Sequence, residues 1–355
     1  MNLAAIASWA LAVPILPVLG VFLTEALAGL PRSSRSPQPV ARMPRTVILM
    51  PAHNEEAGIA RTIASVLKVA PDALSILVVA DNCTDRTAPL AREAGAEVIE
   101  RHDLQHRGKG YALAFGRDHL RADPPECVVI LDADCVPTPG SLATLAKAAV
   151  LAAKPVQATN LIEPDLGARP MVQISNFAFL VKNLIRQRGA ARIGAAAVLT
   201  GTGMAFPWPA FSNAALASGD IVEDLALSIG MMREGHVPRF IEGAMVTSEA
   251  ASERDTITQR TRWEHGFVKT ALRWGLPLLG EGVVKQNWPI FWMGLALLFV
   301  FSVYYQVLPG PGRIDPRMQP PPFVTGFMTI DTLLSGNLVA FKDALAHLVL
   351  PSLVL

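Results

Sequence analysis

Two aspartates separated by one residue are the side chains in this sequence that are best suited to chemistry. Asp132 and Asp134 follow Val128-Val-Ile-Leu131, which has the continuous apolar character of a strand buried on both faces of a parallel sheet. A two-residue repeat sends both carboxylates to one side of the strand end, where they can hold a hard divalent cation that bridges a diphosphate. A solvated turn is the alternative, because aspartate is common in turns.

Polar clusters also follow the two preceding apolar runs, in Pro51-Ala-His-Asn-Glu55 and Asp81-Asn82. Their carboxylate and amide groups can hydrogen-bond a base and a ribose, and Gly108-Lys109-Gly110 adds a cation with close backbone approach. Each cluster alone also fits ordinary turn chemistry, and the spacings of the P-loop and the dinucleotide fingerprint are absent. Together the clusters favour a nucleotide-diphosphate site. The candidate nucleotide-binding residues are Pro51, Asn54, Glu55, Asp81, Asn82, Lys109 and Asp132.

The second half of the chain carries a further acidic pair, Glu223 and Asp224, before an apolar helical pattern. Asp224 has the chemistry of a general base, which takes the proton of an acceptor hydroxyl. Stabilisation of the helix N-terminus by the two anions is the alternative. The preceding loop, Thr200-Gly-Thr-Gly203, fits a flexible wall over a bound sugar or a plain hairpin turn.

A third polar group, Gln259, Arg262 and Trp263, falls on a helix predicted to begin near Asp255. Arg262 can neutralise a departing diphosphate and Trp263 can stack on a sugar ring. An amphipathic helix at a membrane surface explains the same arginine and tryptophan, and the two interpretations are compatible.

The elements that must position these groups alternate along the chain. Strands are predicted at 46–50, 74–80 and 128–131 and beginning at 98–99, with helices at 55–70, 86–94 and 108–120 between them. This alternation predicts a doubly wound α/β domain with a mainly parallel sheet, in which ligands bind at the carboxyl ends of the strands.

Composition adds a membrane component. The chain has 355 residues, of which 51% are hydrophobic and 17% charged, and its 31 basic residues balance 30 acidic ones, so no charge bias points to nucleic acid. Residues 1–30 are almost free of charge and predict a membrane anchor rather than a signal peptide. The basic linker at 31–45 predicts that the following domain is cytoplasmic. Three cysteines without a paired spacing fit a reducing environment.

From residue 46 to 280, the sequence closely resembles the family 2 glycosyltransferases, inverting enzymes of the GT-A fold that include cellulose and hyaluronan synthases. The motifs, in order, are Pro51-Ala-His-Asn-Glu55, Asp81-Asn82-Cys-Thr-Asp85, Arg107-Gly-Lys-Gly110, Asp132-Ala-Asp134, Thr200-Gly-Thr-Gly203, Glu223-Asp224 and Gln259-x-x-Arg262-Trp263.

The resemblance implies a role for each motif. Asp81 would contact the nucleobase, Asp132 and Asp134 would flank a diphosphate bound to Mg²⁺ or Mn²⁺, and Asp224 would be the catalytic base. Glu223, Gln259, Arg262 and Trp263 would border the acceptor and the diphosphate. The implied donor is a UDP-sugar, and the implied acceptor is a hydroxyl of a glycan or of a lipid-linked molecule.

The last 65 or so residues, from about Pro289, resemble instead a piece of a dipeptide or oligopeptide ABC-transporter permease. The coupling loop that engages an ATPase is absent from this piece, and residues 290–308 form one plausible membrane span. A transport component with a non-functional transferase-like region is therefore the alternative to an enzyme.

The sequence predicts five segments. These are an N-terminal transmembrane anchor at 1–30, a linker at 31–45, a cytosolic GT-A domain at 46–254, interfacial helices at 255–285 and a permease-like membrane segment at 286–355. The predicted fold is thus an α/β GT-A domain with flanking transmembrane helices. The predicted function is sugar transfer at the bacterial inner membrane, in exopolysaccharide or cell-envelope glycan synthesis.

Overall fold

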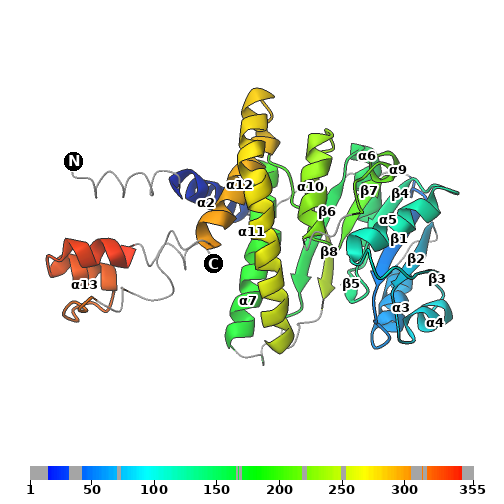
Figure 1. Ribbon diagram of the computed structural model, residues 1–355, viewed down its shortest axis with the longest axis horizontal. Coiled ribbons are helices and arrows are strands. Elements are labelled where there is room, and N and C mark those ends of the chain that lie inside the picture. Colours follow the sequence, from blue (N-terminus) through cyan, green and yellow to red (C-terminus); the bar gives the residue numbers. More distant parts are fainter. Residues whose placement is uncertain are drawn as a thin grey trace.

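The computed structural model describes residues 15–31, 42–69, 73–164, 167, 170–217, 222–248, 253–304, 314 and 318–345. Its centre is an eight-stranded sheet with the order β3-β2-β1-β4-β7-β6-β8-β5, flanked by helices on both faces (Figure 1). The helices at the left of the figure, on the β8 side of the sheet, come mostly from the second half of the chain.

The first half of the sheet is parallel, as predicted. It consists of β1 (Thr46–Ala52), β2 (Leu74–Asp81), β3 (Glu97–Arg101) and β4 (Cys127–Ile130), and β1 pairs with both β2 and β4. The β-branched and apolar residues of β1, β2 and β4 are mostly buried on both faces, which explains why their pattern is continuous rather than alternating, whereas Val98 and Ile99 of the edge strand β3 are half-buried. The carboxyl ends of β1, β2 and β4 consequently lie at one edge.

The second half of the sheet is mixed, so the prediction of a mainly parallel sheet holds only for the first half. Its strands are β5 (Cys135–Pro137), β6 (Val156–Ile162), β7 (Met204–Pro207) and β8 (Arg239–Ser248). β7 runs antiparallel to both β4 and β6, and β5 runs antiparallel to β8. β5 and β7 are too short to show a period of their own, and tertiary pairing decides that they are strands.

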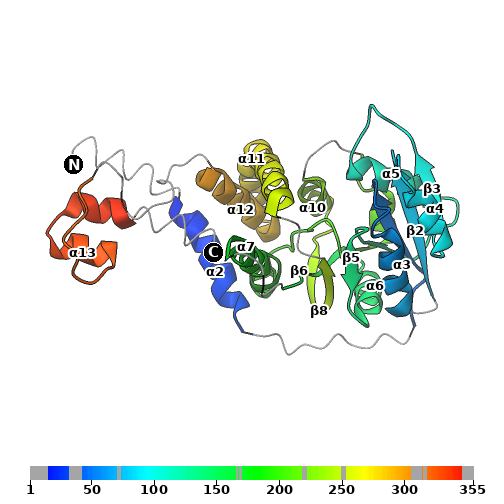
Figure 2. The ribbon, with the colours of Figure 1, turned by 90° about the horizontal axis from the view of Figure 1, so that it is seen from below.

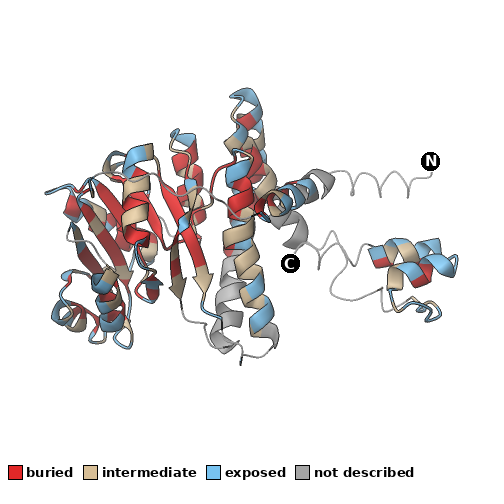
Figure 3. Cartoon of the chain, turned by 180° about the vertical axis from the view of Figure 1, so that it is seen from behind, coloured by how far each residue is buried: buried red, intermediate tan, exposed pale blue. Residues whose placement is uncertain are grey.

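Each face of the sheet has its own core. Ile48 and Met50 of β1 pack with α3 (Ile59–Val69) and α6 (Ser141–Ala152), whereas Leu49 packs on the opposite face with α5 (Lys109–Leu120), α9 (Trp208–Ser212) and α10 (Glu223–Arg233). Figure 2 shows these two layers on either side of the strands. Buried residues are concentrated along the strands in Figure 3. The short α4 (Thr87–Glu93) joins β2 to β3 and packs beside α3.

A group of helices packs beside the sheet. It contains α2 (Ile15–Gly29), α7 (Pro170–Leu180), the π-helical turn η1 (Val181–Arg186), α8 (Gln187–Arg192), α11 (Glu253–Val284) and α12 (Trp288–Tyr304). The backbones of α11 and α12 approach closely at Gly294, where an added Cβ would lie 2.7 Å from the backbone nitrogen of Leu279. Beyond them, α13 (Met328–Leu334) is a short helix.

The expected membrane spans require a correction. Within the described residues, no helix is both long enough and apolar enough to cross a bilayer. Helix α2 covers 15 residues of the predicted anchor and α12 covers 17 residues at the second predicted span, whereas about 20 residues are needed to cross. In addition, the buried Glu25 of α2 binds Arg186 and Trp292. Residues 1–14 and 305–313 lie outside the described part of the chain.

Candidate functional site

A cleft of about 720 Å³ lies at the carboxyl ends of β1, β2 and β4, and we refer to it as the strand-end cleft. It brings together residues that are up to 83 positions apart in the chain, because three parallel strands end at one edge. All seven candidate nucleotide-binding residues line it. The lining residues are Pro51 to Glu55, Asp81, Asn82, Thr84, Leu104, Arg107 to Lys109, Ala112 and Asp132 to Asp134.

Lys109 lies between the aspartate pair at the end of β4 and the acidic pair Glu223 and Asp224. Its Nζ lies 2.5 Å from Asp132 Oδ1 and 3.9 Å from Glu223 Oε1, and it donates a hydrogen bond of 2.8 Å to the Gly201 carbonyl. Burial alone would lower the pKa of Lys109, but the carboxylates of Asp132, Glu223 and Asp224 outweigh that effect and leave the pKa raised. The lysine therefore stays cationic between the paired aspartates and the second acidic pair.

The paired aspartates offer oxygen ligands for a cation. Ligand atoms of Asp132, Asp134 and Cys135 lie within 4.8 Å of one another. Burial raises the pKa of the Cys135 thiol, which donates a hydrogen bond to Asp134 Oδ1 at 3.4 Å, so the sulfur remains protonated. Two carboxylates without a thiolate form a donor set for a hard ion such as Mg²⁺ or Mn²⁺, and the residues present fit that group.

The turn after β1 is held in an unusual backbone conformation. Asn54 has a φ of +57°, in the left-handed region, and its side-chain oxygen accepts a hydrogen bond of 2.8 Å from the Thr84 backbone N–H. This contact ties the turn after β1 to the turn after β2. Glu55 lies near the aspartate pair, and burial together with the charges of Asp134 and Asp132 raises its pKa. Such strained positions cluster at functional sites.

The turn after β2 depends on an arginine that the sequence interpretation missed. Asp81 Oδ1 accepts hydrogen bonds from Arg101 Nη1 at 2.7 Å and from Asn82 Nδ2 at 3.0 Å, and the Asp81 and Arg101 side chains are 10% and 9% exposed. Arg101 also binds Asp103 and the ring of Tyr111. It is a single arginine at the end of β3, and only the strand order places it beside Asp81.

The second acidic pair begins α10 and lies near Lys109 of the cleft. The backbone N–H of Leu225 donates to Asp224 Oδ1 at 2.7 Å, so stabilisation of the helix N-terminus and a position beside the site hold together for this residue. Burial raises the pKa of Asp224 against the opposing charge of Lys182 and Lys109. Burial also raises the pKa of Glu223, to about 7, although Lys109 opposes the shift.

The glycine-rich loop crosses between Lys109 and Asp224 and leads into β7. At Gly201, which has a φ of +83°, an added Cβ would lie 3.2 Å from Lys109 Nζ and 3.6 Å from Asp224 Oδ2. Thr202 Oγ1 accepts a hydrogen bond from the Asp132 backbone N–H. The positive φ of Gly201 and the close approach of its backbone to Lys109 and Asp224 therefore both favour glycine at this position.

Gln259, Arg262 and Trp263 lie in α11, as predicted, but their side chains fall outside the described residues. One turn further along the helix, the described Phe267 lies under Lys182, whose Nζ is 4.9 Å from the ring centroid. This end of α11 therefore faces η1, the element that carries Lys182.

Comparison with known proteins identifies the fold and the family. The family described as glycosyltransferase-like family 2 matches residues 44–266. The chain belongs to this family. Its structure also superposes on that of a mannosyltransferase from Pyrobaculum calidifontis, which was solved in complex with GDP-Man and Mn²⁺, with a TM-score of 0.60 at 16% identity over 99% of this chain and 96% of that one. The resemblance inferred from the motifs is thus confirmed, together with the mixed α/β GT-A fold.

Curated relatives fall into two groups. The probable glycosyltransferase YdaM of Bacillus subtilis is 26% identical over 63% of this chain and 55% of its own length. The probable D,D-dipeptide transport system permease protein DdpB of Escherichia coli is 49% identical over 25% of this chain and 31% of its own length. The chain therefore spans less than a third of this permease and about half of YdaM.

Proposed function

We propose that this chain is an inverting glycosyltransferase that moves a sugar from a nucleotide-diphosphate donor to a hydroxyl acceptor. One observation carries the proposal. Lys109 bridges the aspartate pair at the end of β4 and the acidic pair at the start of α10, with its Nζ 2.5 Å from Asp132 and 3.9 Å from Glu223. A diphosphate held beside Asp132 would put the anomeric carbon of its sugar close to Asp224.

The chemistry assigned to these residues is a direct displacement. The acceptor oxygen attacks the anomeric carbon while the bond from that carbon to the diphosphate oxygen breaks, and the electron pair leaves with the nucleoside diphosphate. Asp224 takes the proton of the attacking hydroxyl. Its raised pKa suits this role, because a base whose pKa lies closer to the operating pH transfers protons more efficiently. Lys109 stabilises negative charge on the departing diphosphate.

Asp132 and Asp134 are the residues that would hold Mg²⁺ or Mn²⁺, which supplies positive charge to stabilise the leaving diphosphate. Asp81 and Asn82 would hydrogen-bond the base, and Pro51, Asn54 and Glu55 would form the floor under the nucleoside. Glu223, Gln259, Arg262 and Trp263 would border the acceptor and the diphosphate. The assignments of residues 51–134 rest on their common lining of the cleft and on the motifs, and those of Glu223, Gln259, Arg262 and Trp263 rest on the motifs alone.

We further propose that the donor is a UDP-sugar, that the acceptor is a glycan or a lipid-linked molecule, and that the product belongs to an exopolysaccharide or cell-envelope glycan. The same proposal places the enzyme at the bacterial inner membrane with its catalytic domain in the cytoplasm. Its support is the apolar segment at 1–30 followed by Arg32, Arg35, Arg42 and Arg45.

A second candidate is a peptide-transporter permease component, which the similarity to DdpB favours. The assembled cleft argues for the enzyme, because a relic has no physical reason to keep the seven nucleotide-site residues and Asp134 around one cavity, with Asp224 close to its Lys109.

The deciding experiment measures release of the nucleoside diphosphate from UDP-sugars and GDP-sugars, with and without Mn²⁺. Metal-dependent release that is lost in Asp224→Asn supports the transferase. The proposal fails if wild type and Asp224→Asn release equal amounts, or if neither nucleotide is released.

A further inference from the structure

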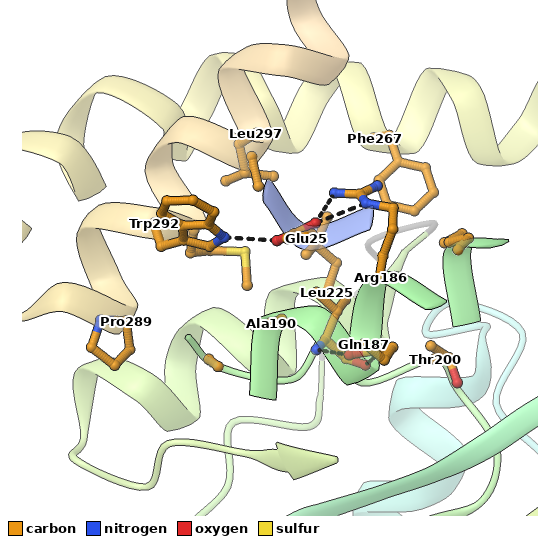
Figure 4. Close-up of a pocket in the computed structure, with 15 residues that line it drawn as sticks. Glu25, Arg186, Gln187, Ala190, Thr200, Leu225, Phe267, Pro289, Trp292 and Leu297 are labelled. Atoms are coloured by element: carbon orange, nitrogen blue, oxygen red, sulfur yellow. Dashed lines mark hydrogen bonds and ion pairs between the residues drawn. The ribbon is translucent and has the colours of Figure 1, made fainter. Parts of the chain in front are cut away.

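A second cavity lies behind Asp224, enclosed by α2, η1, α8, α10, α11 and α12, and we call it the inner cavity (Figure 4). Its volume of about 260 Å³ is slightly below the usual range of small-molecule sites, about 300–1,000 Å³. Much of the lining is apolar, and Leu225, Phe267, Trp292, Met293 and Leu297 supply large side chains. Apolar walls with few polar groups are typical of ligand pockets.

One end of the inner cavity adjoins the proposed catalytic base. Thr200 and Leu225 line the cavity, and they are the chain neighbours of Gly201 and Asp224, which lie close to Lys109 of the strand-end cleft. A molecule that fills the inner cavity would therefore place one end close to Asp224, where an acceptor hydroxyl must lie to lose its proton to that carboxylate.

Most of the charge in the inner cavity is already paired. Glu25 accepts hydrogen bonds from Arg186 Nε at 2.8 Å and from Trp292 Nε1 at 2.7 Å, and Figure 4 shows these groups pointing toward one another. Arg186 Nη2 also lies 2.6 Å from Glu25. The arginine is thus neutralised by a carboxylate from α2, and it is not the group that would bind a ligand anion.

Lys182 is the basic residue of the inner cavity that can bind a ligand anion. Among the described residues, its Nζ has no carboxylate at salt-bridge distance, and its recorded contact is with the ring of Phe267. Burial lowers its pKa, Asp224 opposes this effect, and Arg186 adds to it. The lysine sits in the π-helical turn Val181–Arg186, and π-turns are rare and frequent at functional sites.

We propose that the inner cavity selects an anionic amphiphile as the acceptor, with a phosphate group against Lys182 and a hydrocarbon chain against Phe267, Met293 and Leu297. The acceptor class is a molecule whose reacting hydroxyl is joined through phosphate to an apolar chain. The assignment rests on the transferase function proposed above and names its acceptor. Lys182 is then a specificity-determining residue, and α2 and α12 form the walls that hold the chain.

The test compares acceptors that carry a phosphate with neutral analogues of similar apolar chain length. Citronellyl-diphosphate N-acetylglucosamine is paired with octyl N-acetylglucosaminide, and dihexanoyl phosphatidylglycerol with dihexanoyl glycerol, which separates a polyprenyl source from a glycerolipid source. For wild type, kcat/KM for the anionic member of at least one pair exceeds that for the neutral member by about 10-fold or more, the usual size of a charge-assisted contact.

Lys182→Met brings this ratio close to one, and Lys182→Arg keeps most of it. The ratio is used because Lys182 also influences Asp224 and its loss changes turnover for every acceptor. Lys68→Met, at an exposed position on α3, is the matched control and leaves the ratio at its wild-type value.

The inference is overturned if the ratio survives in Lys182→Met, if wild type prefers the neutral members, or if wild type hydrolyses the donor but glycosylates none of the four probes. A wild-type chain that releases no nucleoside diphosphate under any condition refutes the transferase proposal instead. The two failures are therefore distinguishable in one assay.

Discussion

The strand-end cleft and the inner cavity both lie close to Asp224, and they are built differently. Most residues that line the cleft are polar or charged, and they follow strands β1, β2, β3 and β4, within the first 134 residues. The inner cavity is mostly apolar, and helices from both ends of the described chain enclose it. There, Trp292 of α12 donates a hydrogen bond to Glu25 of α2.

The two halves of the proposed reaction therefore depend on different structural features, namely rigid strand ends for the donor and a pocket between helices for the acceptor. Diphosphate chemistry needs carboxylates and a cation at fixed distances, and rigid parallel strands supply them at one edge. Acceptor selection depends on the volume and charge of a pocket between helices, which can change without disturbing the strands. Substitutions in the cleft should therefore affect the rate, and substitutions in the inner cavity should affect acceptor choice and stability.

The largest expected effect is at the boundary between the two regions. Asp224→Asn removes the base and should lower kcat by about 10²–10⁴-fold, because proton transfer from the acceptor is lost. Release of nucleoside diphosphate measures it, with Asp118→Asn at a half-exposed position as the control. A variant that keeps full activity would place the base elsewhere.

The cleft should also depend on its metal-type carboxylates. Asp134→Asn should raise the Mn²⁺ concentration for half-maximal activity by about 10–100-fold, because one of the two carboxylates loses its negative charge. Cys135→Ala, which changes the neighbouring protonated thiol, should leave that concentration near its wild-type value. Equal shifts in the two variants would show that the thiol is a ligand.

Backbone geometry separates the loop over the site from loops elsewhere. Gly201→Ala adds a Cβ at 3.2 Å from Lys109 Nζ and should lower kcat/KM by about 10–100-fold, with a stability loss of about 1–2 kcal/mol from the positive φ. Gly95→Ala, at a φ of +95° with only Leu67 nearby, should cost similar stability and keep activity. Kinetics and urea unfolding distinguish the two variants. Equal activity in both would show that the close approach of Gly201 to Lys109 has no effect on catalysis.

The ion pair of Glu25 with Arg186 in the inner cavity should contribute mainly stability. Glu25→Gln leaves Arg186 without a carboxylate partner and should lower the free energy of unfolding by about 1–3 kcal/mol. Glu93→Gln, whose ion pair with Arg86 is 3.9 Å long and exposed, should change it little. Nucleoside diphosphate affinity should be retained in Glu25→Gln, and its loss would mean that the two regions are not separable.

The smallest expected effect is a shift in pH dependence. Burial raises the pKa of Asp224 above the ordinary aspartate value of about 3.9. Because the base must be deprotonated, kcat/KM should be highest above the raised pKa and should decrease as the pH falls through it. Lys182→Met removes a charge that lowers this pKa, so the acid limb should move to higher pH. Lys68→Met is the control, and a limb that stays in place would disconnect Lys182 from the base.

The residues of the strand-end cleft were predictable because each follows a strand whose apolar run is visible in the sequence. Arg101 was not predictable, since only the order of β2 and β3 puts it against Asp81. The short β5 and β7 and the antiparallel pairing of the second half were missed for a similar reason: a run of three or four residues has no readable period.

The apolar segments at 1–30 and 290–308 show what an apolar run leaves out. Such a run predicts a membrane span when its partners are unknown, and in the structure the described parts of these segments form helices α2 and α12, which pack on each other and on α8 and α11. In the structure, Glu25 in the first segment forms an ion pair with Arg186. No such partner can be identified from the chain pattern alone.

The sequence by itself determined the first half of the α/β domain, the family and the edge at which the polar groups gather, because these follow from local periodicity and from strands that end together. Only the tertiary structure decided that Lys109 joins the two acidic pairs and that a second cavity lies behind Asp224. Both depend on contacts between residues 92 to 267 positions apart, and such contacts leave no local trace in the chain.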